Sequence, residues 1–145
     1  MKGVFDRVSP AQFAEKVGIP PAWLVVSWRW MPGKSERRRQ HGKWYKIRSP
    51  DAAIYRVLRF SSNLGGGPKQ GTGDIVLDWP GWIELSDFAE DTSLRLELEL
   101  TPVSWWEYPR CAISHPDPTH RLAGELAVLS VALGLLSVLL AFALS

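Results

Sequence analysis

The sequence predicts a mainly β domain, a small antiparallel β-sandwich or barrel, followed by one C-terminal transmembrane helix. Two observations predict it. Between residues 23 and 108, short segments alternate apolar and polar residues and are separated by Gly, Pro and Ser turns. From residue 126 to residue 144 no residue is charged, and only Ser130 and Ser137 are polar. We therefore expect a β-rich domain over 1–110, a Pro-containing linker over 111–121 and a transmembrane helix over 122–145.

A short helix is predicted near the N-terminus, before the first strand. Ser9 is a suitable N-cap, Pro10 suits the first helical position, and Gln12 lies where a capping box places its polar partner. Gly18 and the following prolines stop the pattern. The expected helix covers about residues 10–17.

The strand pattern begins where the period changes to two. Residues 23–30 form the first predicted strand, with Leu24, Val26, Trp28 and Trp30 on one face. Residues 94–100 show the clearest alternation, with leucines at every even position facing inward. The other predicted strands are 44–48, 54–61, 75–79 continuing at 82–85, and 103–108.

Three connecting segments are predicted to lack regular structure. Residues 31–42 read as a basic loop, and residues 63–73, which contain five glycines, as the tip of a long hairpin. Residues 111–120, with Pro116 and Pro118, read as an extended linker into the membrane helix.

The C-terminal segment has the length and composition of a membrane span. Its 19 uncharged residues would extend about 28 Å as a helix, close to the hydrocarbon thickness of a bilayer. A buried core helix is the alternative, but apolar residues occupy every face and a small domain has no core wide enough to surround it. We therefore predict a single-pass membrane protein.

The expected topology is a C-terminal anchor with the N-terminal domain in the cytoplasm. The N-terminus has Asp6 and Arg7 where a signal peptide would have its apolar region. Arg110 and Arg121 place positive charge on the N-terminal side of the helix. The single cysteine, Cys111, fits a reducing compartment.

Small residues recur along the predicted membrane helix at spacings of four and three, the repeat of a heptad. Such residues let two helix backbones approach closely, so this face is a candidate helix–helix interface. The small-residue seam consists of Ala123, Ala127, Ser130, Gly134, Ser137 and Ala141. Arg121 and Glu125, four residues apart at the entrance to the helix, are predicted to form an interfacial ion pair.

The basic loop carries the strongest signal for function in the β-domain. Its cations, interleaved with aromatics, suit anionic lipid headgroups or another anionic ligand, and a membrane tether favours lipid over nucleic acid. A solvated loop is the alternative. The candidate contact residues are Lys34, Arg37, Arg38, Arg39, Lys43, Trp44, Lys46 and Arg48.

Residue patterns for catalysis or for metal and cofactor binding are weak. His115, Asp117 and His120 are too few for a typical metal site, and Cys111 with His115 lacks a third catalytic group. Gly65–Lys69 lacks the Gly-Lys-Ser/Thr ending of a phosphate-binding loop. We expect no enzymatic activity, no cofactor and no metal.

The combined features suggest an accessory or assembly subunit of a membrane protein complex with a cytosolic interaction domain. Its expected partners are the membrane, other membrane-protein subunits or a second copy through the helix, and possible anionic lipid; nucleic acid is not expected. The alternative is a ligand-sensing membrane effector, in which an anionic ligand on the basic β-domain drives oligomerisation of the transmembrane helix.

Overall fold

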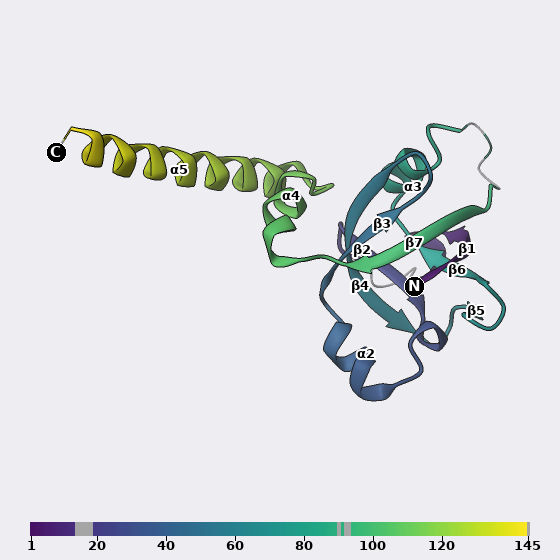
Figure 1. Cartoon of the computed structure of the whole chain (residues 1–145). Helices are drawn as coiled ribbons and strands as arrows, with labels where there is room; N and C mark the ends of the chain where they lie inside the picture. The colour runs from purple at the N-terminus through teal and green to yellow at the C-terminus, as the bar shows by residue number, and fades with distance from the viewer. Residues whose placement is uncertain (14–18, 90, 92–93, 145) are drawn as a thin grey trace.

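The fold is a small β-barrel from which one long helix projects (Figure 1). It was obtained as a computed structural model that describes residues 1–13, 19–89, 91 and 94–144. The strands are β1 (Lys2–Val8), β2 (Trp23–Ser27), β3 (Trp44–Arg48), β4 (Ala53–Ser61), β5 (Gly66–Gly67), β6 (Thr72–Val76) and β7 (Leu96–Pro102). The helices are α1 (Pro10–Phe13), α2 (Lys34–Gln40), α3 (Trp79–Leu85), α4 (Tyr108–Ile113) and α5 (Pro118–Ala143), with 3-10 turns η1 (Trp28–Trp30) and η2 (Trp105–Glu107).

The strands close on themselves. Within the described residues the sheet order is β1-β7-β3-β4-β2-β6, and a further pairing of β6 with β1 completes a six-stranded barrel. The two-residue strand β5 adds to β6 outside this ring. The predicted mainly β fold with a C-terminal helix is confirmed. Of the two predicted architectures, sandwich and barrel, the structure has the barrel.

The strand pairing is mixed. Most ladders are antiparallel, but β1 pairs with β6 and β2 with β4 in parallel. The second of these arises because α2 and the reversing strand β3 lie between β2 and β4 in sequence. The chain therefore enters β4 in the direction of β2, and a parallel pair needs such a longer connection.

The barrel interior is filled by alternate residues of its strands. On β7, Leu96, Leu98 and Leu100 are buried while Glu97 and Glu99 face outward, as predicted from the alternation. Trp82 and Leu85 of α3 close one end of the barrel and belong to the same core. Burial of this kind is the main stabilising term for a domain of this size.

The segment around residues 75–85 corrects one strand prediction. Strand β6 ends at Val76, and residues 79–85 form helix α3 instead of continuing the strand. Asp78 caps this helix by accepting a hydrogen bond from Gly81 N (2.9 Å), and Pro80 lies in its first turn. An Asp N-cap followed by Pro is a helix start, so this signal outweighed the apolar alternation.

Three other segments are also more helical than predicted. Residues 34–40 of the basic loop form α2. In the predicted strand over 103–108, residues 105–108 form η2 and the first residue of α4. Ser104 and Glu107 make a capping box at η2. The expected extended linker is mostly helical, because α4 includes Cys111 and α5 begins at Pro118.

Three smaller differences concern the N-terminal half. Trp28 is 39% exposed instead of facing inward, because β2 ends at Ser27 and η1 turns the chain. Strand β1 was not predicted; only Phe5 of its residues is buried, so its alternation is weak. The expected helix over 10–17 is seen as α1 over Pro10–Phe13, and residues 14–17 lie outside the described part.

Candidate membrane-facing site

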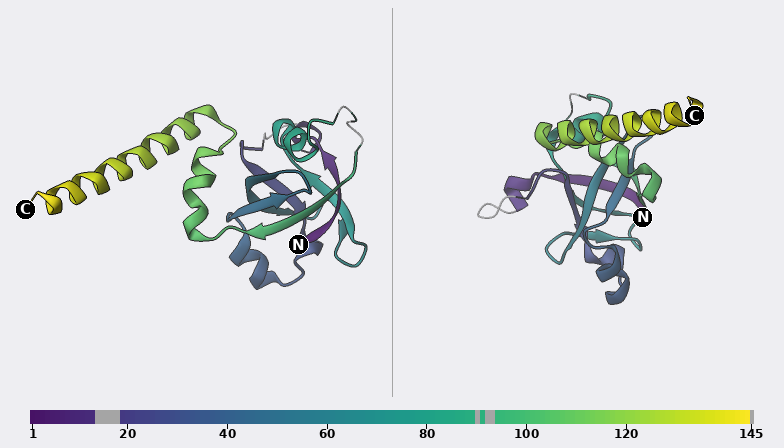
Figure 2. Two further views of the ribbon diagram at one scale, coloured as in Figure 1. Left: turned by 45° about the horizontal axis from the view of Figure 1, so that its top comes forward. Right: turned by 90° about the vertical axis from the view of Figure 1, so that its left-hand side faces the viewer.

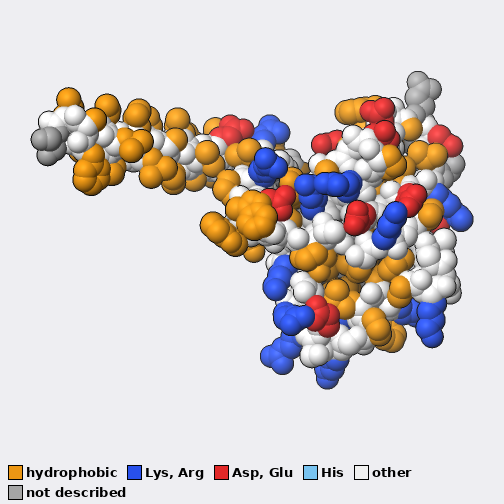
Figure 3. All heavy atoms as spheres, in the orientation of Figure 1, with side chains coloured by type: hydrophobic (Ala, Val, Ile, Leu, Met, Phe, Trp, Pro, Cys, Tyr) orange, Lys and Arg blue, Asp and Glu red, His pale blue; other side chains and the backbone are white. Residues whose placement is uncertain are grey.

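Helix α5 is the only described helix long and apolar enough to cross a membrane. It has 26 residues, and none of its apolar window is buried against the protein. Figure 3 shows hydrophobic side chains along the part of this helix that projects away from the barrel, beyond the charged side chains at its start. Water is a poor solvent for such a surface, which a bilayer would cover.

The start of α5 is held by α4. A Cβ on Gly124 would lie 2.8 Å from the Ala112 Cβ, so the two helices approach closely at this glycine. Asp117 caps α5 by accepting a hydrogen bond from Thr119 N (2.8 Å). Figures 1 and 2 show α4 lying between the barrel and α5, so that α4 joins the two.

All six residues of the small-residue seam are exposed in the isolated chain. Gly124, which contacts α4, is turned by about 100° from Ala123, so α4 leaves the seam open. The Ser130 and Ser137 hydroxyls donate to Leu126 O (2.8 Å) and Leu133 O (2.9 Å) of the preceding turn. The seam therefore offers a smooth, narrow face with its polar groups satisfied within the helix.

Arg121 and Glu125 are both exposed. The ion pairs within the described residues do not include one between them. Their pairing at the membrane interface stays a prediction.

The basic residues fall into two groups with different surroundings. Lys34, Arg38 and Lys43 are exposed on α2 and the turn after it, with no side-chain partner in the described part of the chain. Arg39 is also exposed and forms an ion pair with Glu36. These side chains lie together near one end of the barrel and form an exposed positive surface.

The other basic residues serve the fold or lie elsewhere. Arg37 donates to Met31 O (2.9 Å) and Pro32 O (2.8 Å) and lies over the Trp28 ring. It therefore holds the loop before α2. Lys46 pairs with Glu107 (3.6 Å), which ties β3 to η2.

Trp44 and Arg48 occupy the two ends of β3. Trp44 packs edge-on against His115 in the link to α5. Arg48 lies at the far end of the strand, about 13 Å away for a five-residue strand, and is not part of the α2 surface.

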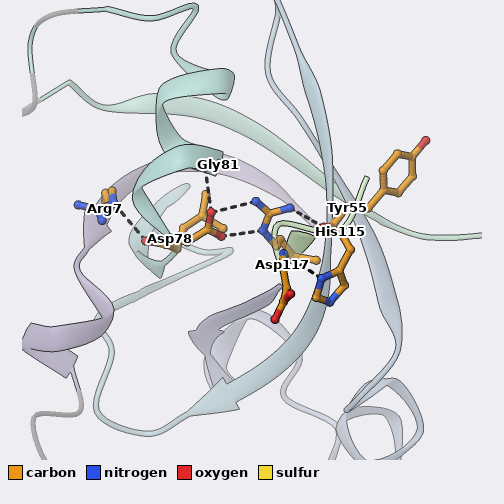
Figure 4. A network of polar contacts seen from close by, with 8 residues as sticks. Arg7, Tyr55, Asp78, Gly81, His115 and Asp117 are labelled. Atoms are coloured by element: carbon orange, nitrogen blue, oxygen red, sulfur yellow. Dashed lines mark hydrogen bonds and ion pairs between the residues drawn. The ribbon is translucent and has the colours of Figure 1, made fainter. Parts of the chain in front are cut away.

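A buried ion pair lies beneath this junction, which the sequence did not indicate. Arg56 donates through Nε to Asp78 Oδ1 (2.7 Å) and through Nη2 to Oδ2 (3.0 Å), and only 3% of Arg56 is exposed. Figure 4 shows Asp78 between this guanidinium and the Gly81 amide. Burial alone would raise the pKa of Asp78, but Arg56 and the Gly81 N–H outweigh it and hold the pKa below its usual value.

The same arginine borders a cavity of about 360 Å³ between the barrel, α3 and the start of α5. His115 and Arg121 also line it. Burial and the neighbouring His120 lower the pKa of His115, and its Nδ1 accepts from Asp117 N (3.0 Å), so the ring is neutral at pH 7. Glu84 also lines the cavity, so an acidic side chain lies there beside the two arginines.

Cys111 and two histidines are further titratable side chains near this junction. Burial, followed by the charge of Glu107, raises the pKa of the Cys111 thiol to about 11, so it is unreactive at neutral pH. His115 and His120 pack together (4.8 Å between rings), but no group of three or more metal-binding side chains occurs among the described residues.

No protein-family model matches the chain, and no curated protein matches it significantly. The functional argument therefore depends on the physical features of the barrel, of α5 and of the junction between them.

Proposed function

We propose that this chain is a single-pass membrane protein in which α5 anchors the barrel and joins it to other membrane-protein subunits. The barrel would serve as the interaction domain of an accessory or assembly subunit. The observation that carries the proposal is the apolar, uncovered surface of α5, with the seam left open by α4. A helix that served only as an anchor would need no such face.

The proposed topology places the barrel on the cytoplasmic side. Arg110 and Arg121 lie within 16 residues before the apolar part of α5. Positive charge next to a span favours the cytoplasmic side.

Substitution within the seam tests the assembly function. Gly134→Leu should weaken assembly, because a Leu side chain on the seam would hold two helix backbones apart, without preventing insertion, because added hydrophobicity favours insertion. A Cβ at Gly134 meets no atom within 4 Å in the chain itself, so the substitution does not disturb α5. Complex size in mild detergent is the measurement.

Leu133→Ala is the matched control, one residue away and off the seam. It should leave complex size close to that of the parent. Assembly of Gly134→Leu at the parent level would contradict the interface and reduce α5 to an anchor.

The alternative function, a ligand-sensing effector, is favoured by the position of the cavity. Its lining includes Arg56 of the barrel and Arg121 of α5, together with Glu84 of α3, so an anion there would lie between the two parts of the molecule. In that case α5 would oligomerise only when the anion is present. Inorganic phosphate is a simple probe: complex size that changes reversibly with phosphate supports this alternative, and constant size contradicts it.

A further inference from the structure

Four apolar or aromatic side chains of η2 and α4 lie exposed beside the start of α5. The aromatic patch consists of Trp105 (77% exposed), Trp106 (65%), Tyr108 (50%) and Ile113 (38%). The two indoles contact each other edge to face, with 6.3 Å between ring centroids. The other side of α4 is covered, since Cys111 is 2% exposed and Ala112 packs on Gly124.

The patch is therefore the solvent-facing side of η2 and α4, whose other side packs on the barrel and on α5. The capping box of Ser104 and Glu107 fixes η2, and the pair between Lys46 and Glu107 ties it to β3. These contacts hold the two indoles on the outside, since no part of the barrel covers them.

The position of the patch along α5 is set by the contact between Ala112 and Gly124. Gly124 lies two residues before Leu126, where the uncharged stretch begins. The patch thus lies at the level where α5 would enter the hydrocarbon. Figure 3 shows hydrophobic side chains gathered there, next to Lys and Arg side chains, on the side of the barrel toward which α5 extends.

We propose that the aromatic patch is a second membrane contact, inserted into the headgroup region of the bilayer that α5 crosses. Trp and Tyr favour this region because their rings are apolar on one side and can hydrogen-bond at the other. Arg110, which lies in α4 between Tyr108 and Ile113, is exposed and suits the phosphates at this depth. The patch is continuous with the apolar surface of α5, so one bilayer covers both.

A second membrane contact would restrict the orientation of the barrel relative to the bilayer. One helix alone would let the barrel tilt and turn about its link to α5. With the patch inserted, the barrel is held to the bilayer at two places, α5 and the segment of η2 and α4, while Figure 1 shows α2 at a different end of the barrel. The barrel would then keep one orientation toward lipid.

This inference rests on the proposed membrane anchor, so its test must separate the two. Single cysteines would carry an environment-sensitive NBD group in the full chain reconstituted into liposomes. The positions are Trp106→Cys in the patch, Leu135→Cys in the middle of α5, and Phe88→Cys as a control on the barrel. Phe88 is 72% exposed, so the same probe there reports any non-specific attraction to lipid. Native Cys111 is buried, and the unsubstituted chain serves as the labelling blank.

Quenching by lipids with a nitroxide near the headgroup or deep in the acyl chain gives the depth of each probe. We expect position 106 to be quenched at least twofold more than position 88 by the shallow lipid, and position 135 to be quenched most by the deep lipid. Quenching of 135 with equal quenching at 106 and 88 would overturn the second contact alone. No quenching at 135 would overturn the anchor and, with it, this inference.

Discussion

The barrel and α5 use the same apolar residue types in opposite ways. In the barrel, Leu98 and Leu100 are fully buried, whereas in α5 Leu135 and Leu139 are 62% and 65% exposed. Burying one such side chain is worth about 1.5–3 kcal/mol. The barrel obtains this gain from its own chain, while α5 can obtain it only from lipid or from other helices. The comparison shows that the barrel covers its own apolar side chains, whereas α5 leaves its apolar side chains uncovered.

The barrel should therefore lose its stability without any loss of membrane association by α5. Disrupting the buried ion pair should show this with the largest effect. Asp78→Ala removes the partner of Arg56 and leaves a buried, uncompensated charge. Breaking such a pair costs about 3–5 kcal/mol. We expect a large loss of barrel stability in chemical denaturation, with membrane association of α5 retained. Denaturation midpoints unchanged from the parent would contradict the structural role of the pair.

The same pair predicts a pH dependence. Because the pKa of Asp78 is lowered in the folded protein, its stabilising contribution is fully present above the unfolded value of about 3.9. That contribution is lost as pH falls through the folded value. Stability of the parent should fall in this acid range, and Asp78→Asn should show a smaller acid-dependent loss.

A smaller effect is expected at the contact between α3 and β4. A Cβ on Gly81 would lie 2.7 Å from Arg56 Nη2 and 2.9 Å from Ile54 Cδ1. Gly81→Ala should destabilise the barrel by about 1–3 kcal/mol, the usual cost of overpacking. Gly33→Ala, where the nearest atom would be 3.6 Å away, is the control and should change the unfolding midpoint less.

The smallest expected effect concerns the positive surface of α2, and it tests whether the barrel itself is attracted to lipid. Arg38→Gln should weaken attraction of α2 to an anionic bilayer by about 1 kcal/mol. Energy transfer from a dye at His41→Cys to labelled headgroups measures it, with Lys69→Gln on the exposed β5–β6 hairpin as the charge-matched control. Equal energy transfer in the parent and in Arg38→Gln at low salt would contradict this attraction, and α2 would then be an ordinary solvent-exposed helix.

Sequence patterns predicted these two regions with unequal success. Period-two alternation on β3, β4 and β7 and the uncharged run of α5 were sufficient, because each reports directly which faces avoid water. The helices α2, α3 and α4 were missed because their start signals are short. The Asp78 cap and the box of Ser104 and Glu107 were both present in the sequence, but alternation of nearby apolar residues was given more weight.

The candidate site was less predictable than the fold. The cations of residues 34–48 were found by composition, but composition cannot separate exposed Arg38 from Arg37, which holds the loop before α2. The pair of Arg56 and Asp78 joins residues 22 apart in sequence, and no local pattern indicates it. The exposure of Trp105 and Trp106 depends on η2 being helical, and the strand prediction concealed it.

Deletion of residues 122–145 tests the central claim most directly, since it separates the two regions physically. Membranes from cells producing the full chain or the shortened chain would be extracted with alkaline carbonate, which removes proteins that do not span the bilayer. We predict that the full chain stays in the membrane pellet and that the shortened chain is released with its barrel folded. Release of the full chain by carbonate would contradict the account of α5 as a membrane span.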